Sequence, residues 1–191
     1  MEPNFDDLES RMRQYQEIKE QVGRQLETYG LTLEDLRGKN VLQIGIGLKR
    51  SELLADEYDF NEEFGTSEPL GQYPKENFDL ILDNGGVDYL VGRKGEIYTE
   101  LLNEILALLK KSGQYRRMMA LSDEEVFNLL AIPENSREVT IGDYKAATKI
   151  FATDIRKLLA AKASNIKVTG TVMADLGGSH YVNILLIFEK I

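Results

Sequence analysis

The segment Asn40 to Ser51, NVLQIGIGLKRS, constrains the fold of this chain more than any other. Its first half, Val41 to Ile46, is a short apolar and β-branched run, which is typical of a strand buried on both faces. Gly45 and Gly47 then allow a tight turn in which the backbone can approach a ligand closely. A helix is predicted to begin at Ser51. A buried strand, a glycine turn and a helix in this order indicate a parallel α/β sheet.

Strand and helix patterns alternate along the rest of the chain, and no internal repeat interrupts them. Two further buried strands are predicted, Phe78–Leu82 and Gln114–Leu121, although Arg116 and Arg117 are an awkward pair for a central strand. The predicted helices are 51–59, Tyr98–Leu109, which ends at Lys110 to Gly113, then Asp123–Leu130 with a capping box, and Tyr144–Ala163. The closing strands, Ile166–Met173 and Tyr181–Glu189, flank a glycine-rich turn and should pair antiparallel. The stretch Phe60–Lys75 matches no element.

The N-terminus precedes this alternation and carries a helical pattern of its own. Apolar residues recur there at steps of three and four and form one stripe of an amphipathic helix: Phe5, Leu8, Met12, Tyr15, Ile18, Val22, Leu26 and Tyr29. A second, short helix is predicted at Thr32 to Arg37, capped by Thr32 and Asp35. The stripe packs on its own domain, forms a homodimer, or covers a ligand site as a lid. We therefore divide the chain into a helical extension, 1–37, and one α/β domain, 38–191.

Composition narrows the classes of function. The chain has no cysteine, which excludes disulfides, thiolate nucleophiles and cysteine-ligated metals, and its single histidine excludes a multi-histidine metal site. No metal site is predicted. A net charge of -9 would repel a phosphate backbone, so a nucleic-acid partner is not expected. We find neither an apolar run long enough to span a membrane nor a signal peptide, and therefore expect a cytoplasmic protein.

Several segments, taken in order, resemble the class I S-adenosylmethionine-dependent methyltransferases. NVLQIGIGLKRS is similar to the first strand and glycine loop of that family, and PKENFDLILDNGGVDYL to its fourth strand with the segment that follows. LLNEILALLKKSGQYRRM resembles the helix and turn before its fifth strand, and the two closing strands resemble its sixth and seventh. The resemblance implies a Rossmann-like, mostly parallel sheet with an antiparallel C-terminal strand, flanked by helices. The distance from Gly47 to Phe78 is short for two strand and helix units, so one unit should be missing or abbreviated.

The resemblance also implies a cofactor site for S-adenosylmethionine at the first two strands. Gly45 and Gly47 would form its turn, while Gln43 stands where the family commonly has an acidic residue. A second acid of the family holds the ribose hydroxyls, because a carboxylate can accept two hydrogen bonds. The matching position falls near Thr66, which leaves Glu63 and Glu68, one on either side, as candidates.

Further candidates follow the later strands. Asp83 and Asn84 end the predicted strand FDLIL at the edge where parallel sheets bind ligands, and they either contact the cofactor or substrate or merely form a tight turn. Asp88 and Tyr89 match the family positions beside the same cleft. His180, in the turn between the last strands, is either a general base or simply solvated.

Two functions remain open from the sequence. The first is a methyltransferase that uses S-adenosylmethionine and a small-molecule acceptor. The second is a catalytically degenerate methyltransferase-like module for binding or assembly, which Gln43, Lys49 and the short middle segment favour. A nicotinamide oxidoreductase is less well supported, because Lys49 and Arg50 replace the third glycine of the dinucleotide-binding turn.

Overall fold

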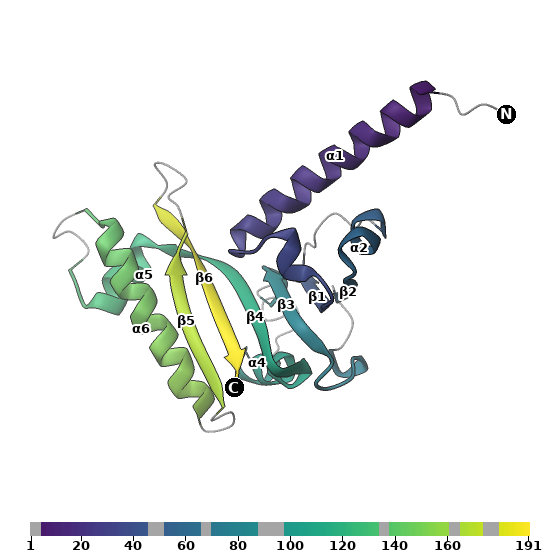
Figure 1. Ribbon diagram of the computed structural model, residues 1–191. Helices are drawn as coiled ribbons and strands as arrows, with labels where there is room; N and C mark the ends of the chain where they lie inside the picture. Colours follow the sequence, from purple (N-terminus) through teal and green to yellow (C-terminus); the bar gives the residue numbers. More distant parts are fainter. Residues whose placement is uncertain are drawn as a thin grey trace.

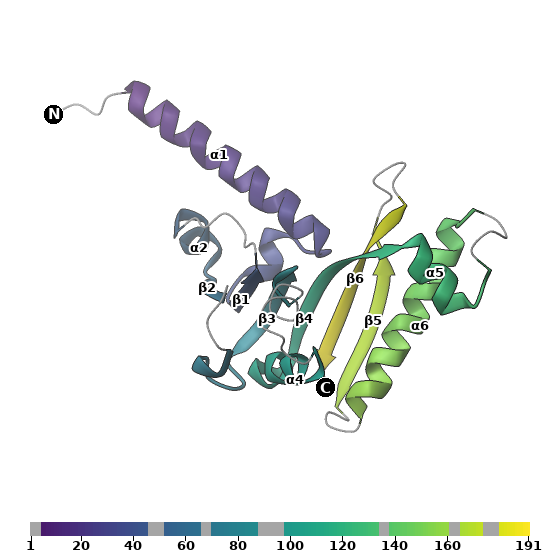
Figure 2. The same cartoon turned by 180° about the vertical axis from the view of Figure 1, so that it is seen from behind.

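The computed structural model describes residues 5–45, 52–65, 70–87, 98–133, 138–160, 165–173 and 180–191. These residues form one mixed sheet with helices on both faces and a long N-terminal helix that leaves the body of the molecule (Figures 1 and 2). The strands are β1 Asn40–Gly45, β2 Asn61–Gly65, β3 Phe78–Asn84, β4 Leu109–Ser122, β5 Ile166–Val172 and β6 Tyr181–Lys190. The helices are α1 Phe5–Thr28, α2 Glu52–Tyr58, α4 Tyr98–Leu108, α5 Asp123–Leu130 and α6 Ile141–Ala160, with short 3-10 helices η1 Leu33–Leu36 and η2 Leu70–Gln72.

The strand order across the sheet is β2-β1-β3-β4-β6-β5. Strands β2, β1, β3 and β4 are parallel to one another, whereas β6 runs antiparallel between β4 and β5. The chain leaves β1 to form β2 on one side and then returns to form β3 on the other. This reversal makes a topological switch point at the carboxyl ends of β1 and β3, which is where open α/β sheets bind ligands.

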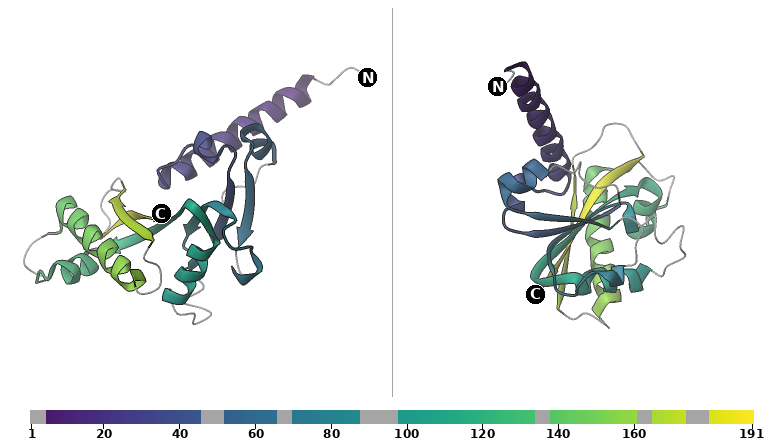
Figure 3. Two further views of the ribbon diagram at one scale, coloured as in Figure 1. Left: turned by 60° about the horizontal axis from the view of Figure 1, so that its bottom comes forward. Right: turned by 90° about the vertical axis from the view of Figure 1, so that its right-hand side faces the viewer.

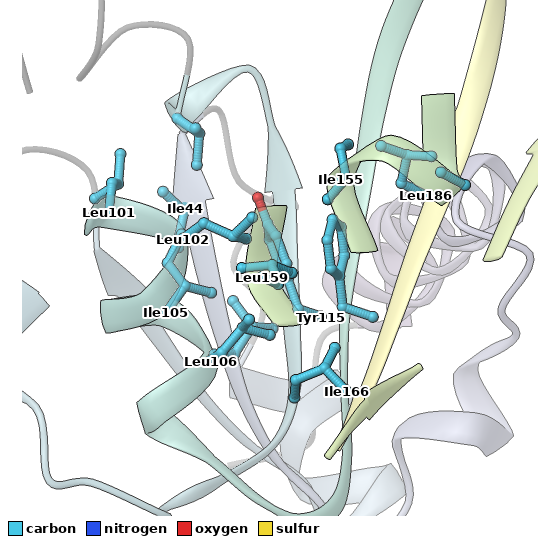
Figure 4. Close-up of a cluster of buried hydrophobic side chains, with 14 of the residues drawn as sticks. Ile44, Leu101, Leu102, Ile105, Leu106, Tyr115, Ile155, Leu159, Ile166 and Leu186 are labelled. Atoms are coloured by element: carbon cyan, nitrogen blue, oxygen red, sulfur yellow. The ribbon is translucent and has the colours of Figure 1, made fainter. Parts of the chain in front are cut away.

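Two hydrophobic clusters hold the helices to the two faces of the sheet. One contains buried side chains of α4, α5 and α6 packed on the sheet, and Figure 4 shows its centre around Tyr115, Leu102 and Ile105. The other joins α1, η1 and α2 to the opposite face, where Leu26 and Leu36 are fully buried. The second half of the predicted extension therefore shares a core with the sheet. Strands buried on both faces explain the continuous apolar runs of β1 and β3.

The Rossmann-like fold predicted from the sequence is confirmed, including the antiparallel C-terminal strand and the N-terminal helix. The expected loss of a unit also agrees with the described residues, because only η2 stands between β2 and β3 there. Both predicted caps are present, since Thr32 with Asp35 and Ser122 with Glu125 form capping boxes.

One detail of the predicted elements was wrong. The helix α4 ends at Leu108, and Lys110 and Lys111 belong to β4 rather than to a helix stop. The register explains the error, because β3 advances from Phe78 to Leu80 while β4 advances from Leu109 to Gln114, so the intervening residues bulge out of the ladder. The strand β2 lies within Phe60–Lys75, the stretch for which the sequence predicted no element.

Candidate functional site

Two glycine turns meet at the switch point of the sheet. Gly45 ends β1 with a positive φ of 93°, and Gly85 and Gly86 follow the end of β3. A Cβ atom on Gly45 would lie 2.7 Å from the backbone nitrogen of Gly86, and one on Gly86 would lie 2.6 Å from the nitrogen of Gly45. Only glycine permits this approach of the two backbones. The result is a main-chain contact between the two turns at the carboxyl ends of β1 and β3, the position at which open α/β sheets bind ligands in a crevice, and the exposed Asn84 lies there in register with Gly45.

Asp83 lies directly below the contact between the two turns and holds the second turn in place. Its carboxylate is fully buried, and Oδ1 accepts hydrogen bonds from the backbone N–H groups of Gly86 at 2.7 Å and Val87 at 3.2 Å. Oδ2 accepts a 2.8 Å bond from the hydroxyl of Tyr115 and lies 3.6 Å from Nε of Arg117. The side chain therefore orients backbone donors rather than facing solvent.

Arg117 extends this buried network from β4 to the start of α4. It donates a 2.8 Å hydrogen bond to the hydroxyl of Tyr98, and its guanidinium lies 5.1 Å from the centre of that ring. Burial raises the pKa of Asp83, while Arg117, the Tyr115 hydroxyl and the two backbone donors oppose the rise. Burial also raises the pKa of Tyr115 well above its ordinary value, and the charge of Asp83 adds to the rise. The hydroxyl of Tyr115 thus remains a donor at neutral pH.

Arg116 and Arg117, an unusual pair for a central strand, have separate partners in the structure. Side chains alternate along a strand, so Arg116 and Arg117 point to opposite faces of β4. Arg116 donates to the backbone oxygens of Tyr29 at 2.6 Å and Gly30 at 3.2 Å and thereby ties α1 to the sheet. Arg117 belongs to the network below the crevice. An arginine in a buried strand signals a buried carboxylate partner, although only the pairing of β3 with β4 identifies that partner as Asp83.

The other residues predicted to bind the cofactor either lie within β1 and β2 or fall outside the described residues. Gln43 is buried in β1, and it pairs with Leu82 in the ladder rather than lying at the crevice. Glu63 is exposed on β2, opposite Leu42 and two residues before the strand ends. Gly47 and Glu68 lie outside the described residues, as do Lys49, Arg50, Asp88 and Tyr89. Among the described candidates, the structure thus brings together Gly45, Asp83 and Asn84.

His180 is not close to this group. The Nδ1 atom of the exposed imidazole lies 3.2 Å from Oδ2 of Asp123, whose other oxygen accepts a hydrogen bond from Tyr144. In the ladder, Asn84 is level with Met118, whereas His180 precedes the residue that pairs with Ser122. Four to five further residues of strand correspond to roughly 15 Å along the sheet. The geometry does not support His180 as a base beside the crevice.

A cleft lies at the opposite, amino-terminal edge of the sheet. It is a cleft of about 480 Å³ between α4 and the ends of β5 and β6, and its lining includes Glu100, Glu104, Asn165 and Lys190. The amino group of Lys190 donates hydrogen bonds to the carboxylate of Glu76 and to the backbone oxygen of Leu109. This edge is away from the switch point, so the cleft is a rival ligand site that an experiment must distinguish.

Comparisons with known proteins give structural likenesses only. No protein-family model matches the chain, and no curated protein sequence matches it. A 1,6-didemethyltoxoflavin-N1-methyltransferase from Burkholderia thailandensis aligns with a TM-score of 0.48 at 15% identity, over 97% of this chain and 86% of that one. A SAM dependent methyltransferase from Archaeoglobus fulgidus gives 0.47 at 15%, over 90% and 94%. An O-methyltransferase from Bacillus cereus gives 0.45 at 16%, over 86% and 81%.

Two other features, a membrane-spanning helix and a metal site, are absent from the described residues. Within the parts of the chain that the structure describes, no helix is long and apolar enough to span a bilayer. The same parts contain no cluster of three or more histidine, aspartate or glutamate residues suited to a metal ion.

Proposed function

We propose that this protein is a methyltransferase that binds S-adenosylmethionine over Gly45 and Asn84 and methylates a small molecule. One observation carries the proposal: two glycine turns touch at the switch point, where a Cβ atom on Gly45 or Gly86 would collide with the backbone of the other turn. Main chain without side chains at the carboxyl ends of parallel strands suits a ligand that must approach the backbone closely. Of the residues predicted for the cofactor, Gly45 and Asn84 would contact it, and Asp83 would orient the turn beneath.

The strand order favours this cofactor over a nicotinamide dinucleotide. A dinucleotide-binding sheet of the doubly-wound type is mostly parallel with strand order 3-2-1-4-5-6, whereas here β6 is inserted antiparallel between β4 and β5. The resemblance of the sequence to class I methyltransferases includes this antiparallel strand. The sequence agrees, because Lys49 and Arg50 replace the third glycine that a dinucleotide-binding turn normally has.

Little catalytic machinery is needed for this reaction. When bound, S-adenosylmethionine would supply a methyl group on a sulfonium sulfur, and an acceptor would attack the methyl carbon in line, so that the carbon–sulfur bond breaks and S-adenosylhomocysteine leaves. The protein contributes by holding the two reactants in that alignment, for which rigid backbone at Gly45 and Gly86 is well suited. The net charge of -9 supports a small acceptor rather than a nucleic acid.

The second candidate is a degenerate module that binds partners but no cofactor. The burial of Gln43, and the position of Glu63 within β2 rather than at its end, favour it, because they leave the described part of β1 and β2 without an acidic side chain at the crevice. The two candidates differ in one measurable property, which is affinity for S-adenosylhomocysteine.

Calorimetric titration and thermal unfolding with S-adenosylhomocysteine test the proposal. A ligand present at 100 times its Kd stabilises a protein by about 2.7 kcal/mol, which raises Tm by roughly 5–10 °C for a chain of this size. We expect such a rise with the methyltransferase product and none with NAD at the same concentration. The absence of heat and of any shift at millimolar S-adenosylhomocysteine and S-adenosylmethionine would leave the degenerate module as the better account.

A pair of asparagine variants locates the binding within the same experiment. Asn84→Ala should weaken the affinity for S-adenosylhomocysteine about tenfold, the equivalent of one hydrogen bond, with unchanged Tm in the absence of ligand. Asn165→Ala is the matched control, because it removes an exposed amide from the rival cleft. A loss of affinity in Asn165→Ala but not in Asn84→Ala would place the ligand at the wrong edge for our proposal.

A further inference from the structure

Tyr98, the first residue of α4, lies at the same edge of the sheet as the two glycine turns. The helix lies against the parallel part of the sheet (Figure 3), and it leads directly into Leu109, which pairs with Phe78 at the amino end of β3. The start of α4 therefore lies toward the carboxyl end of β3. The contacts agree, since the Tyr98 hydroxyl meets Arg117, whose partner in the ladder is Asp83.

Arg117 meets Tyr98 through a directional contact and Asp83 through charge. Its Nη1 atom donates a 2.8 Å hydrogen bond to the Tyr98 hydroxyl, and the guanidinium lies 5.1 Å from the centre of that ring. Its Nε atom lies 3.6 Å from Oδ2 of Asp83, which is beyond the range of a hydrogen bond. Charge attraction at that distance sets no precise geometry, so the bond to Tyr98 contributes the direction that the ion pair lacks.

Asp83 transmits the position of Arg117 to the second glycine turn. Its Oδ2 atom faces Arg117 and the Tyr115 hydroxyl. Its Oδ1 atom accepts hydrogen bonds from the N–H groups of Gly86 and Val87. The two oxygens belong to one planar group, so a change in the pull on Oδ2 turns Oδ1 relative to those N–H groups. The carboxylate is fully buried, where hydrogen bonds and charges act more strongly than in water.

The hydroxyl of Tyr98 is not needed to hold α4 on the sheet. Buried apolar side chains of the helix do so, and they include Leu101, Leu102, Ile105 and Leu106. Tyr98 is only partly buried and packs at the margin of the same cluster. Removal of its hydroxyl should therefore leave the helix in place, which separates a role in the site from a role in the fold.

We propose that Tyr98 is a positioning residue for the cofactor site. Its hydroxyl fixes Arg117, Arg117 fixes the carboxylate of Asp83, and the carboxylate holds the turn at Gly86 in the arrangement that binds the ligand. A turn already in that arrangement loses less free energy on binding, so affinity falls with the fraction of molecules in which the turn is displaced. The role rests on the proposed function, but the link from Tyr98 to the turn exists without ligand and can be measured separately.

Amide hydrogen exchange of the ligand-free protein tests the link. Tyr98→Phe keeps the aromatic ring but removes the hydrogen bond to Arg117. Exchange at the N–H groups of Gly86 and Val87 should then be about three to ten times faster, the equivalent of part or all of one hydrogen bond. These groups are far from the substitution along the chain, and unchanged exchange at both of them would overturn the proposal.

Tyr144→Phe is the matched control. Tyr144 is buried in the same hydrophobic cluster, and its hydroxyl also bonds a charged side chain, that of Asp123 at the start of α5. Asp123 follows the end of β4, away from the two glycine turns. Tyr144→Phe should leave exchange at Gly86 and Val87 unchanged. Faster exchange in both variants would show a general loosening of the core and would contradict a specific link.

Affinity for S-adenosylhomocysteine tests the effect on the site. Calorimetry should give a Kd about three to ten times higher for Tyr98→Phe than for the wild type or for Tyr144→Phe. In the Arg117→Met background, Tyr98→Phe should have no further effect, because the link is already broken. An equal loss of affinity in both backgrounds would mean that Tyr98 does not act through Arg117.

The two measurements separate this role from the proposed function. A wild-type protein that binds no S-adenosylhomocysteine would refute the proposed function and this role with it. A wild type that binds, together with a Tyr98→Phe variant of equal affinity, would refute the positioning role alone. Neither result requires the Arg117→Met variant, which is expected to be much less stable.

Discussion

Replacement of Gly45 by alanine is expected to lower the free energy of unfolding by about 2–4 kcal/mol and to abolish binding of S-adenosylhomocysteine. The substitution has two costs. A residue with a Cβ atom is strained at a φ of 93°, and that atom would lie 2.7 Å from the nitrogen of Gly86 and 2.9 Å from the backbone oxygen of Asn84. Because these contacts are backbone atoms, the two turns must separate. The contact between the two turns, against which the cofactor is proposed to bind, is lost together with part of the stability.

The control for this prediction is Gly85→Ala in the adjacent turn. Gly85 also has a positive φ, of 77°, but a Cβ atom there would meet nothing within 4 Å. Gly85→Ala should therefore lower the free energy of unfolding by about 1 kcal/mol, the cost of the backbone conformation alone, and should still bind S-adenosylhomocysteine. Chemical denaturation and calorimetry on both variants give the comparison. Equal losses of stability would show that the two turns are not in contact, and unimpaired binding by Gly45→Ala would show that the cofactor lies elsewhere.

Removal of Arg117 is expected to have a second large effect, and one that depends on pH. Arg117→Met keeps most of the volume of the side chain but leaves Asp83 buried without its cationic partner. Breaking a buried pair in this way costs about 3–5 kcal/mol near neutral pH. The same substitution at Arg116, which is only half buried and bonds to backbone oxygens, should cost less and show no such pH dependence.

The sign of the pH dependence follows from Asp83. Burial already raises the pKa of Asp83 in the folded protein, and loss of Arg117, which opposes that rise, must raise the pKa further. A carboxyl group with a raised folded pKa contributes stability that is fully present below its ordinary pKa of about 4. That contribution is lost as the pH rises through the folded pKa. Arg117→Met should therefore lose more stability relative to wild type at pH 8 than at pH 5.

A double variant separates charge from packing. Asp83→Asn in the Arg117→Met background removes the uncompensated carboxylate while keeping an oxygen that can accept from Gly86 and Val87. It should recover part of the stability lost at pH 8 and abolish the pH dependence. Urea denaturation at the two pH values measures both quantities. A double variant less stable than Arg117→Met at pH 8 would mean that the carboxylate is favourable in its charged form without arginine.

Much of the fold was predictable because its signals are local. The apolar runs of β1 and β3, the stripe of α1 and the capping box at Ser122 each lie within a few residues of sequence, and each is present in the structure. β2 carried no such signal. Its sequence, NEEFG, is polar for an inner strand, and it forms because β1 offers an open edge at Val41 to Ile44. An edge strand needs less apolar surface than a central one.

The site was less predictable because it depends on contacts between distant segments. The glycines at 45 and 86 are ordinary turn residues in sequence, and only the meeting of β1 with β3 makes them neighbours. The network of Asp83, Tyr115 and Arg117 spans two strands and could not be located by spacing. The position of His180 was predictable only in part. It lies at the expected edge of the sheet, but β4 and β6 extend beyond the end of β3, so that His180 is distant from Asn84.

The most direct test of the central claim is a crystal structure of the protein with S-adenosylhomocysteine. The proposal predicts ligand density at the carboxyl ends of β1 and β3, against the backbone of Gly45 and Gly86 and within hydrogen-bonding distance of Asn84. Density in the cleft beside Glu104 and Lys190, at the other edge of the sheet, would contradict the assignment of the site. A crevice left empty at saturating ligand would contradict the proposed function itself.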